Sequence, residues 1–323
     1  MRSTAIRATI VSAACLAAAM LALGIAGASA QTRRIIVPYT PGSGPDILAR
    51  LMAEQIGAQN GPNMVVENRP GGGMVIGTEV AARAEPDGNT LLLVANAFVV
   101  NAALKRGNYD IARSFDPVCQ LAATPMVVVV QGSSPYKTIR ELVDAAKQKP
   151  GQLSFASGGP ATSLHIAIEV LRRATGIDVN YVPYGGSLPA INALMGGHVQ
   201  AVVADYPTIV AQLQAGVLRG LATTAAKRVD ALPNVPTLSE SGITQYEDSI
   251  FYGVVAPAGT PAATLKDLSG VLVTALKAPA LQPRLAQQGL SPVGTCGAPF
   301  GAFLRTTVER YERVIKDANI RAN

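Results

Sequence analysis

A glycine-rich loop near the start of the chain carries the first residues suited to bind a small molecule. The loop Pro38–Asp46 leaves a short β-branched run and enters a segment with helical periodicity. Its glycines allow the backbone to approach a ligand closely, and free N–H groups at a helix start attract anions. Asp46 falls in the first helical turn, where it supports the helix dipole, competes with an anion or meets a cationic group of a ligand. An ordinary glycine-rich turn is the alternative interpretation.

Three further loops place glycines or hydroxyl groups directly after expected strands. They are Ser157–His165, Pro183–Pro189 and Asp205–Pro207. Hydroxyl and backbone N–H groups bind a carboxylate without a buried lysine or arginine. Simple capping of a helix by Thr162 or Ser163 is the alternative role for two of the hydroxyls. Because ligands of open parallel sheets bind beyond the carboxyl ends of the strands, these loops predict a cleft lined by helix N-termini.

The same loops supply the residue types of a serine hydrolase. Ser187, His165 and Asp205 would be its nucleophile, base and orienting acid. Gly185–Pro189 departs from the GxSxG pattern at its last position, and His165 and His198 are the two histidines of the chain. We therefore expect His165 to lie on a helix face near the cleft, and we expect a protein that is not an enzyme.

Cofactor and metal sites have little support in the sequence. Residues 42–44 with Glu67 about twenty residues later resemble part of a dinucleotide fingerprint, but its third glycine is missing. Asp46 would also stand where the pyrophosphate should bind. Two histidines without a CxxC or HExxH pattern give no basis for a metal site. We expect the protein to need neither a cofactor nor a metal.

The first 30 residues have the pattern of a secretory signal. Arg2 and Arg7 precede an apolar run from Ala8 to Ala26, and Ala28–Ala30 fits the small-x-small rule for cleavage before Gln31. A retained membrane anchor is the alternative, and Cys15 lacks the context of a lipidated cysteine. No later segment has about eighteen uninterrupted apolar residues. We expect a periplasmic protein.

The charge of the chain makes nucleic acid an unexpected partner. The formal net charge is +6, two of which belong to the signal arginines, so +4 remains after cleavage. This charge is spread along the chain without a basic run, which excludes the footprint of a nucleic-acid-binding surface. A mild positive charge suits the capture of small anions by weak electrostatic steering.

Two cysteines, Cys119 and Cys296, remain after the signal. They could pair in an oxidising compartment, but their spacing does not demand it. We expect two separate buried thiols.

Strand-like and helix-like patterns alternate along the chain, which predicts a doubly wound α/β fold with parallel strands. We expect Gly57 to stop the first helix. After Pro261 we expect helices alone. The expected strands are 34–37, 64–66, 90–94, 126–130, 153–156, 179–182, 199–203, 220–223 and 251–256, and the expected helices are 47–56, 74–84, 139–146, 162–175, 188–195, 262–276, 281–287 and 300–317.

So many strands fit two adjacent domains better than one sheet. The strands 126–130 and 251–256 are the expected crossings between them. We therefore expect a discontinuous first domain, residues 31–131 plus 250–323, and a second domain, residues 132–249, each a mainly parallel sheet flanked by helices.

The order of several short segments resembles one known family. They are Ile36–Asp46, Val66–Gly71, Pro86–Gly88, Ser157–His165, Val182–Tyr184, Leu232–Thr237 and Ala256–Pro261, which together run through the whole mature chain. No single segment is specific, but their order and spacing resemble the substrate-binding proteins of tripartite tricarboxylate transporters, the TctC-like or Bug family.

The resemblance implies a type II-like periplasmic binding protein that closes two lobes around a small organic anion. Mono-, di- or tricarboxylates or related compounds are the implied ligands, a membrane transporter or a sensor is the implied partner, and we expect a monomer. Asn96 and Asp205 match cleft-lining positions of the family. The full set of expected ligand-binding residues is Tyr39, Gly42, Ser43, Gly44, Asp46, Asn96, Ser157, Gly158, Thr162, Ser163, His165, Tyr184, Gly185, Ser187 and Asp205.

The chain departs from the family at Gly185, where a basic residue is frequent. Ser43 and Pro45 replace frequent glycine and threonine, and Phe251 stands near a frequent tryptophan. Loss of a positive charge at the cleft edge leads to the hypothesis of a less charged ligand.

This hypothesis predicts that monocarboxylates bind more tightly than tricarboxylates. Isothermal titration calorimetry with one compound of each kind measures the difference. Equal or tighter binding of the tricarboxylate would contradict it.

Overall fold

Alternating strands and helices form the first third of the described chain. The computed structural model describes residues 32–159, 162–243 and 247–317, so the expected signal and Cys15 lie outside the described residues. The elements are β1 (Thr32–Val37), α2 (Gly44–Ala58), β2 (Asn63–Asn68), the 3-10 turn η1 (Gly72–Met74), α3 (Val75–Ala82), β3 (Thr90–Ala95), α4 (Asn96–Ala103) and α5 (Ile111–Ser114).

A long strand leads into the middle of the chain, and another leads out of it. The middle elements are β4 (Phe115–Gln131), α6 (Ile139–Gln148), β5 (Ser154–Ser157), α7 (Ser163–Thr175), β6 (Asn180–Pro183), α8 (Ser187–Met195), β7 (Ala201–Asp205), α9 (Tyr206–Gln214) and β8 (Leu218–Thr223). The chain then continues through β9 (Ser249–Pro257), α10 (Ala262–Leu276), α11 (Gln282–Gln287), β10 (Ser291–Cys296) and α12 (Ala298–Asp317).

The strands form a mixed sheet with the order β2-β1-β3-β9-β4-β7-β5-β6, and β8 and β10 also pair with β4. The pairs β1–β2, β1–β3, β5–β6 and β5–β7 are parallel, while the pairs that involve β4 or β9 are antiparallel. The expected α/β class is confirmed, with antiparallel pairing concentrated at the two long strands.

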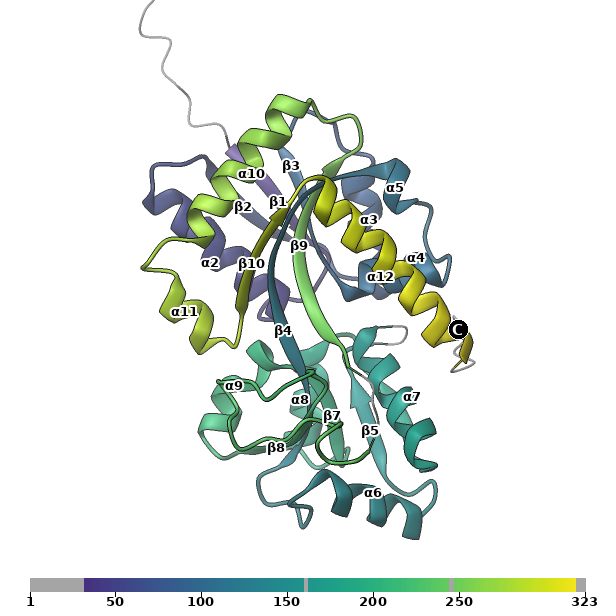
Figure 1. Ribbon diagram of the computed structural model, residues 1–323. Helices are drawn as coiled ribbons and strands as arrows, with labels where there is room; N and C mark the ends of the chain where they lie inside the picture. The colour runs from purple at the N-terminus through teal and green to yellow at the C-terminus, as the bar shows by residue number, and fades with distance from the viewer. Residues whose placement is uncertain (1–31, 160–161, 244–246, 318–323) are drawn as a thin grey trace, which may run out of the picture. The chain divides into compact units, whose positions relative to one another are not determined.

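Strand β4 spans both groups of parallel strands. Its first part, Phe115–Pro125, pairs with β9, and its second part, Met126–Gln131, pairs with β7 and β8. Figure 1 shows β4 and β9 side by side, where they connect the upper elements with the lower ones in opposite directions. The β-branched run Val127–Val130 is buried throughout, which is typical of a strand covered on both faces.

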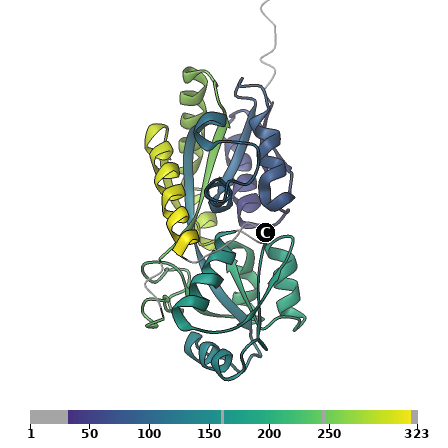
Figure 2. The same ribbon diagram turned by 90° about the vertical axis from the view of Figure 1, so that its right-hand side faces the viewer.

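Helices cover both faces of the strands (Figures 1 and 2). Ile35 and Val37 of β1 belong to the core cluster that contains residues of α2 and α10, whereas Ile36 between them belongs to the cluster that contains residues of α4 and α12. This alternation follows from the two-residue period of a strand. No helix among the described residues has the length and apolar character required to cross a membrane.

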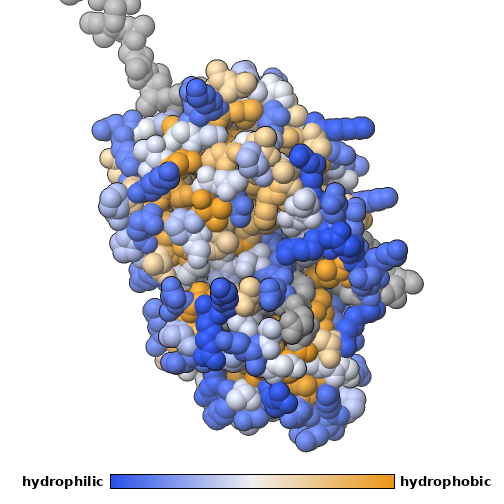
Figure 3. Space-filling view, in the orientation of Figure 1, coloured by the Kyte–Doolittle hydropathy of each residue, from blue (hydrophilic) through white to orange (hydrophobic). Residues whose placement is uncertain are grey.

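The last helix has one buried and one charged face. Phe300, Leu304 and Tyr311 are buried, whereas Arg305, Glu312 and Arg313 are exposed. Figure 3 shows hydrophilic side chains gathered on the right-hand side, where α12 lies in Figure 1. The helical period of 3.6 residues therefore separates the face that completes the core from the face in water.

Three expectations about the elements were wrong. Strand β4 begins at Phe115, eleven residues before the expected start at Met126. Gly57 lies inside α2, which ends one residue later. Strand β10 also interrupts the stretch after Pro261 where helices alone were expected, because Ser291–Cys296 pairs with β4 despite the Pro and Gly residues it contains.

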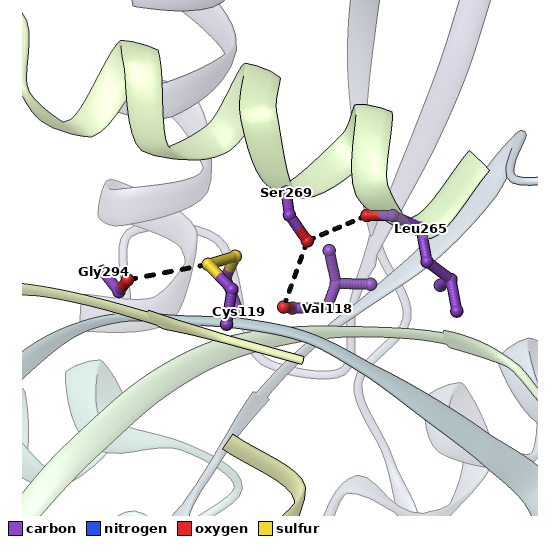
Figure 4. Close-up of a disulfide and its surroundings, with 6 residues drawn as sticks. Val118, Cys119, Leu265, Ser269 and Gly294 are labelled. Atoms are coloured by element: carbon purple, nitrogen blue, oxygen red, sulfur yellow. Dashed lines mark hydrogen bonds between the residues drawn. A yellow bond between two sulfur atoms is a disulfide. The ribbon is translucent and has the colours of Figure 1, made fainter. Parts of the chain in front are cut away.

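The two cysteines form a disulfide, so the expectation of separate thiols was wrong. Cys296 of β10 lies opposite Cys119 of β4 in the antiparallel register, and their sulfur atoms are bonded. Figure 4 shows the bond beside α10, where the Ser269 hydroxyl donates to the Val118 and Leu265 carbonyls. The pairing could not be predicted because β10 itself was not recognised.

Loss of this disulfide should lower the free energy of unfolding by about 2–5 kcal/mol, because it closes a long loop in the unfolded chain. Urea unfolding with and without a thiol reductant measures the change, and the double variant Cys119→Ser, Cys296→Ser is the control that should not respond to the reductant. An unchanged urea midpoint of the native protein after reduction would contradict the prediction.

Candidate functional site

A cavity of about 140 Å³ lies where the loops after β1, β3, β5, β6 and β7 meet. Five helices begin at its wall, since the residues that precede them all line the cavity. These N-cap residues are Ser43 for α2, Ala95 for α4, Thr162 for α7, Gly186 for α8 and Asp205 for α9. The first N–H groups of a helix have no partner within the helix and carry partial positive charge. The cavity wall therefore favours an anion.

The cavity wall favours an anion although no basic side chain of the described residues lines it. Among the described residues that line it there is no lysine, arginine or histidine, and Asp205 is the charged one. Tyr39, Tyr184 and Tyr252 add aromatic surface, and Pro38 and Ile250 add aliphatic surface. Helix N-termini beside apolar walls suit a small organic molecule with an anionic group.

Asp46 organises the first loop from behind the cavity. Its carboxylate accepts the Gly42 N–H (2.8 Å), Arg50 Nε (3.0 Å) and Asn68 Nδ2 (2.9 Å), and the residue is 2 % exposed. Burial raises the pKa of Asp46, but these hydrogen bonds outweigh burial and lower the pKa below its ordinary value. Asp46 is thus ionised at neutral pH and fixes the loop, which favours the supporting role among the three considered for it.

Two hydroxyl groups of the first loop lack partners. Ser43 Oγ and Thr40 Oγ1 are buried without a hydrogen bond within the described structure, and both residues line the cavity. A buried hydroxyl without a partner costs about 1–3 kcal/mol. Both residues therefore keep unused hydrogen-bonding capacity at the cavity wall.

The second loop is held by its own hydrogen bonds. Thr162 Oγ1 accepts the His165 N–H (3.2 Å) and donates to the Gly159 carbonyl (3.0 Å), so the capping role expected as an alternative is present. Ser157 Oγ lies 2.9 Å from the hydroxyl of Tyr181, which also donates to the Gly159 carbonyl. Burial raises the pKa of Tyr181 to about 12, so this hydroxyl stays protonated.

His165 lies on a face of α7 behind this loop, as the helical spacing predicts. Its ring stacks on Tyr181 with the centroids 4.1 Å apart, and its Nε2 lies 3.7 Å from Glu169 Oε1. Hydrogen bonds from His165 and Arg172, together with their charges, lower the pKa of Glu169 despite its partial burial. These contacts give His165 a structural role in supporting the loop.

The loops approach one another so closely that glycine is required at two positions. A Cβ atom on Gly158 would lie 2.9 Å from the Ser187 nitrogen, and one on Gly186 would lie 2.8 Å from Thr40 Oγ1. Gly185 differs, because a Cβ atom there meets nothing within 4 Å. The absence of a basic side chain at Gly185 thus leaves open space beside the cavity.

Asp205 joins the loops at the cavity wall. Its carboxylate accepts hydrogen bonds from the Gly44 N–H (3.1 Å), Ser187 Oγ (3.2 Å), Thr208 Oγ1 (2.7 Å) and the Tyr252 hydroxyl (3.3 Å). The residue is 3 % exposed. The donors come from three helix starts and from β9, so one buried carboxylate ties together segments that are distant in the sequence.

The two tyrosines near this carboxylate remain protonated. Burial first, and then the charge of Asp205, raise the pKa of Tyr252 well above its ordinary value. Burial also raises the pKa of Tyr39, with smaller contributions from Tyr109 and Asp205. Tyr252 can therefore act only as a donor to Asp205 near neutral pH.

The structure brings ten of the fifteen expected ligand-binding residues to the cavity wall: Tyr39, Ser43, Asn96, Gly158, Thr162, Ser163, Tyr184, Gly185, Ser187 and Asp205. The amide of Asn96 is engaged, since its Nδ2 donates to the Tyr311 hydroxyl and its Oδ1 accepts the Phe251 N–H. The five placed behind the wall are Gly42, Gly44, Asp46, Ser157 and His165.

Several residues that line the cavity were not expected from the sequence. Thr40 lies inside the first loop, so its hydroxyl could have been included. Gly71, Gly73 and Met74 follow β2, and the run of three glycines at 71–73 was the available signal. Tyr252 lies within a buried strand, where nothing in the local sequence separates a cavity residue from a core residue.

Fold and site together define a binding protein of the periplasmic type. Residues 48–320 match the family model described as the tripartite tricarboxylate transporter family receptor, TctC. The chain belongs to this family.

Relatives and solved structures agree with this assignment. Protein BugT of Bordetella pertussis is 30% identical over 291 residues, which cover 89% of each chain. A structure described as a periplasmic transporter has a TM-score of 0.87 at 36% identity, over 91% of this chain and 99% of the other. The periplasmic binding protein BugD has a TM-score of 0.86 at 31% identity, over 90% and 99%. R. palustris Rpa4515 with adipate has a TM-score of 0.87 at 29% identity, over 91% and 99%.

Among the described residues no group of three or more His, Cys, Asp or Glu side chains is placed to hold a metal ion.

The substitution Asp205→Asn should lower the free energy of unfolding by about 2–4 kcal/mol, because hydrogen bonds to a charged acceptor contribute about 1.5–3 kcal/mol each and an amide cannot accept all four. Tyr252→Phe should cost about 1 kcal/mol. Denaturant unfolding measures both effects. Asp144→Asn, on the exposed face of α6, is the control; an Asp205 variant as stable as this control would refute the role of the carboxylate.

Proposed function

We propose that the chain is a periplasmic solute-binding protein that captures a small organic carboxylate. The proposal rests on one observation: the starts of five helices and two residues with unpartnered hydroxyls, Ser43 and Thr40, line one cavity without a basic side chain. Helix N–H groups and hydroxyls together satisfy the lone pairs of a carboxylate. The adipate bound to Rpa4515 is a carboxylate of this size class, which supports the proposal.

We further propose that the ligand is enclosed between two lobes, residues 31–131 plus 250–323 and residues 132–249. The pairing of β4 with β9 at one end and with β7 and β8 at the other supports this division. Two continuous strands that connect two lobes form a natural hinge for closure around a ligand. The hydrogen bonds from Gly44 and Tyr252 to Asp205 join the two lobes at the cavity.

In this proposal the chain acts as a monomer in the periplasm, after cleavage near Ala30. The family description and the resemblance to BugD and BugT support delivery of the ligand to a tripartite transporter or to a sensor. The ligand-binding residues are the ten at the cavity wall, with Thr40 and Tyr252 added. Gly42, Gly44, Asp46, Ser157 and His165 position the loops that carry them.

The hydrolase alternative has less support from the geometry. Ser187 Oγ donates directly to Asp205, while the His165 ring stacks on Tyr181 and lies near Glu169. A nucleophile needs its base within hydrogen-bond reach, oriented by the acid. In the proposed binding protein, His165→Ala leaves the ligand-induced rise of the melting temperature in place, whereas an enzyme would lose turnover.

Removal of the unpartnered hydroxyls tests the proposal. Ser43→Ala and Thr40→Val should each weaken adipate binding by about 10- to 150-fold, because the ligand loses one hydrogen bond to an ionised group, which contributes about 1.5–3 kcal/mol. Calorimetry with purified protein, stripped of any carried-over ligand, measures the dissociation constants.

Thr223→Val is the matched control, since the Thr223 hydroxyl is also buried without a partner but does not line the cavity. The control should bind adipate as the native protein does. Unchanged binding in both loop variants would remove these hydroxyls from the site, and no binding of any small carboxylate to the native protein would refute the proposed function.

A further inference from the structure

One wall of the cavity is a backbone segment with an unusual conformation. Gly71, Gly72 and Gly73 have φ angles of 127°, 58° and 62°, and Met74 continues the run with 76°. Left-handed backbone is unfavourable for a residue with a side chain, and such strain gathers at ligand-binding segments. Gly71, Gly73 and Met74 line the cavity. This wall therefore presents mainly backbone to a ligand.

A guanidinium group lies directly behind this wall. A Cβ atom built on Gly73 would lie 3.3 Å from Arg106 Nη1 and 3.5 Å from Nη2. The glycine thus leaves no side chain between the cation and the backbone that lines the cavity. Arg106 does not line the cavity itself, so its charge acts through the thickness of one peptide segment.

Arg106 is half-buried, and its Nη1 atom is buried without a hydrogen-bond partner within the described structure. Glu79, an acid of the neighbouring helix α3, is instead bonded to Arg83 (3.0 Å) and to the Asn108 N–H (2.9 Å). A partly desolvated cation without an anion is unfavourable, and an opposite charge nearby relieves the cost.

The Gly73 carbonyl of this wall already accepts a hydrogen bond, which weakens its repulsion of an anion. Asn101, which is fully buried, donates its Nδ2 to the Gly73 carbonyl at 2.7 Å. This bond engages the Gly73 acceptor from the side of α4.

We propose that Arg106 makes the Gly71–Met74 wall a second anion subsite, which binds the distal carboxylate of a dicarboxylate. The inference rests on the proposed function, in which the first carboxylate is held by Ser43, Thr40 and the helix N-termini. The glycines allow the distal carboxylate to approach the backbone, and the guanidinium behind it supplies the positive charge that the cavity wall lacks. A cation separated by low-dielectric protein acts more strongly than one separated by water.

The test compares adipate with hexanoate, which has the same carbon chain and one carboxylate fewer. The native protein should bind adipate at least about tenfold more tightly. Arg106→Gln should reduce this ratio to about threefold or less and leave hexanoate binding unchanged, whereas Arg106→Lys should retain most of the preference. Lys105→Gln removes the same charge from the adjacent exposed side chain and should behave as the native protein does. Calorimetry measures the dissociation constants.

Three results would overturn the proposal. They are a native preference for adipate below about fivefold, an equal loss of both ligands in Arg106→Gln, or the same loss of preference in Lys105→Gln. The first result needs only the native protein, so it tests the proposal even where the Arg106→Gln variant does not fold. Hexanoate binding with no preference for adipate would refute this inference alone, whereas no binding of these two compounds or of any other small carboxylate would refute the proposed function.

Discussion

The buried carboxylate of Asp205 is the interaction on which the cavity depends. It accepts four hydrogen bonds from Gly44, Ser187, Thr208 and Tyr252, which belong to segments up to 161 residues away. A carboxylate is stable in such a place only when its lone pairs are satisfied, so the four donors must hold their positions. Those positions bring the starts of α2, α8 and α9 to one point beside β9. The need to satisfy this one carboxylate therefore fixes how the loops around the cavity are arranged.

The hydrogen bonds to Asp205 spread its negative charge over four donors, which weakens its repulsion of an anion. The attraction comes from the N-terminal dipoles of the surrounding helices, because no basic side chain of the described residues lines the cavity. Ser43 and Thr40 retain unused hydroxyls for the same space. In the proposed second subsite, Arg106 adds charge behind the Gly71–Met74 wall without lining the cavity itself. Binding specificity then depends on the helix dipoles and on the distance between the two carboxylates of the ligand more than on direct ion pairs.

The elements near the site could be predicted because their signals are local. Glycine and proline after a β-branched run mark the end of a strand, and Thr162 marks the start of a helix. The expectations about β10 and the cysteines were wrong because both features depend on partners far along the chain. Strand β10 has weak strand propensity and forms because β4 lies beside it, so the pairing of Cys119 with Cys296 was hidden as well. The role of Asp46 and the role proposed for Arg106 could not be predicted from the sequence either. Each depends on whether the side chain lies on the cavity side of the backbone or behind it.

The most direct test is a crystal structure of the protein with adipate bound. One carboxylate should lie about 2.7–3.2 Å from Ser43 Oγ and from N–H groups at helix N-termini, with Asp205 still bonded to Gly44 and Tyr252. Adipate at another position, or a carboxylate in this cavity that contacts neither Ser43 nor a helix N-terminus, would contradict it.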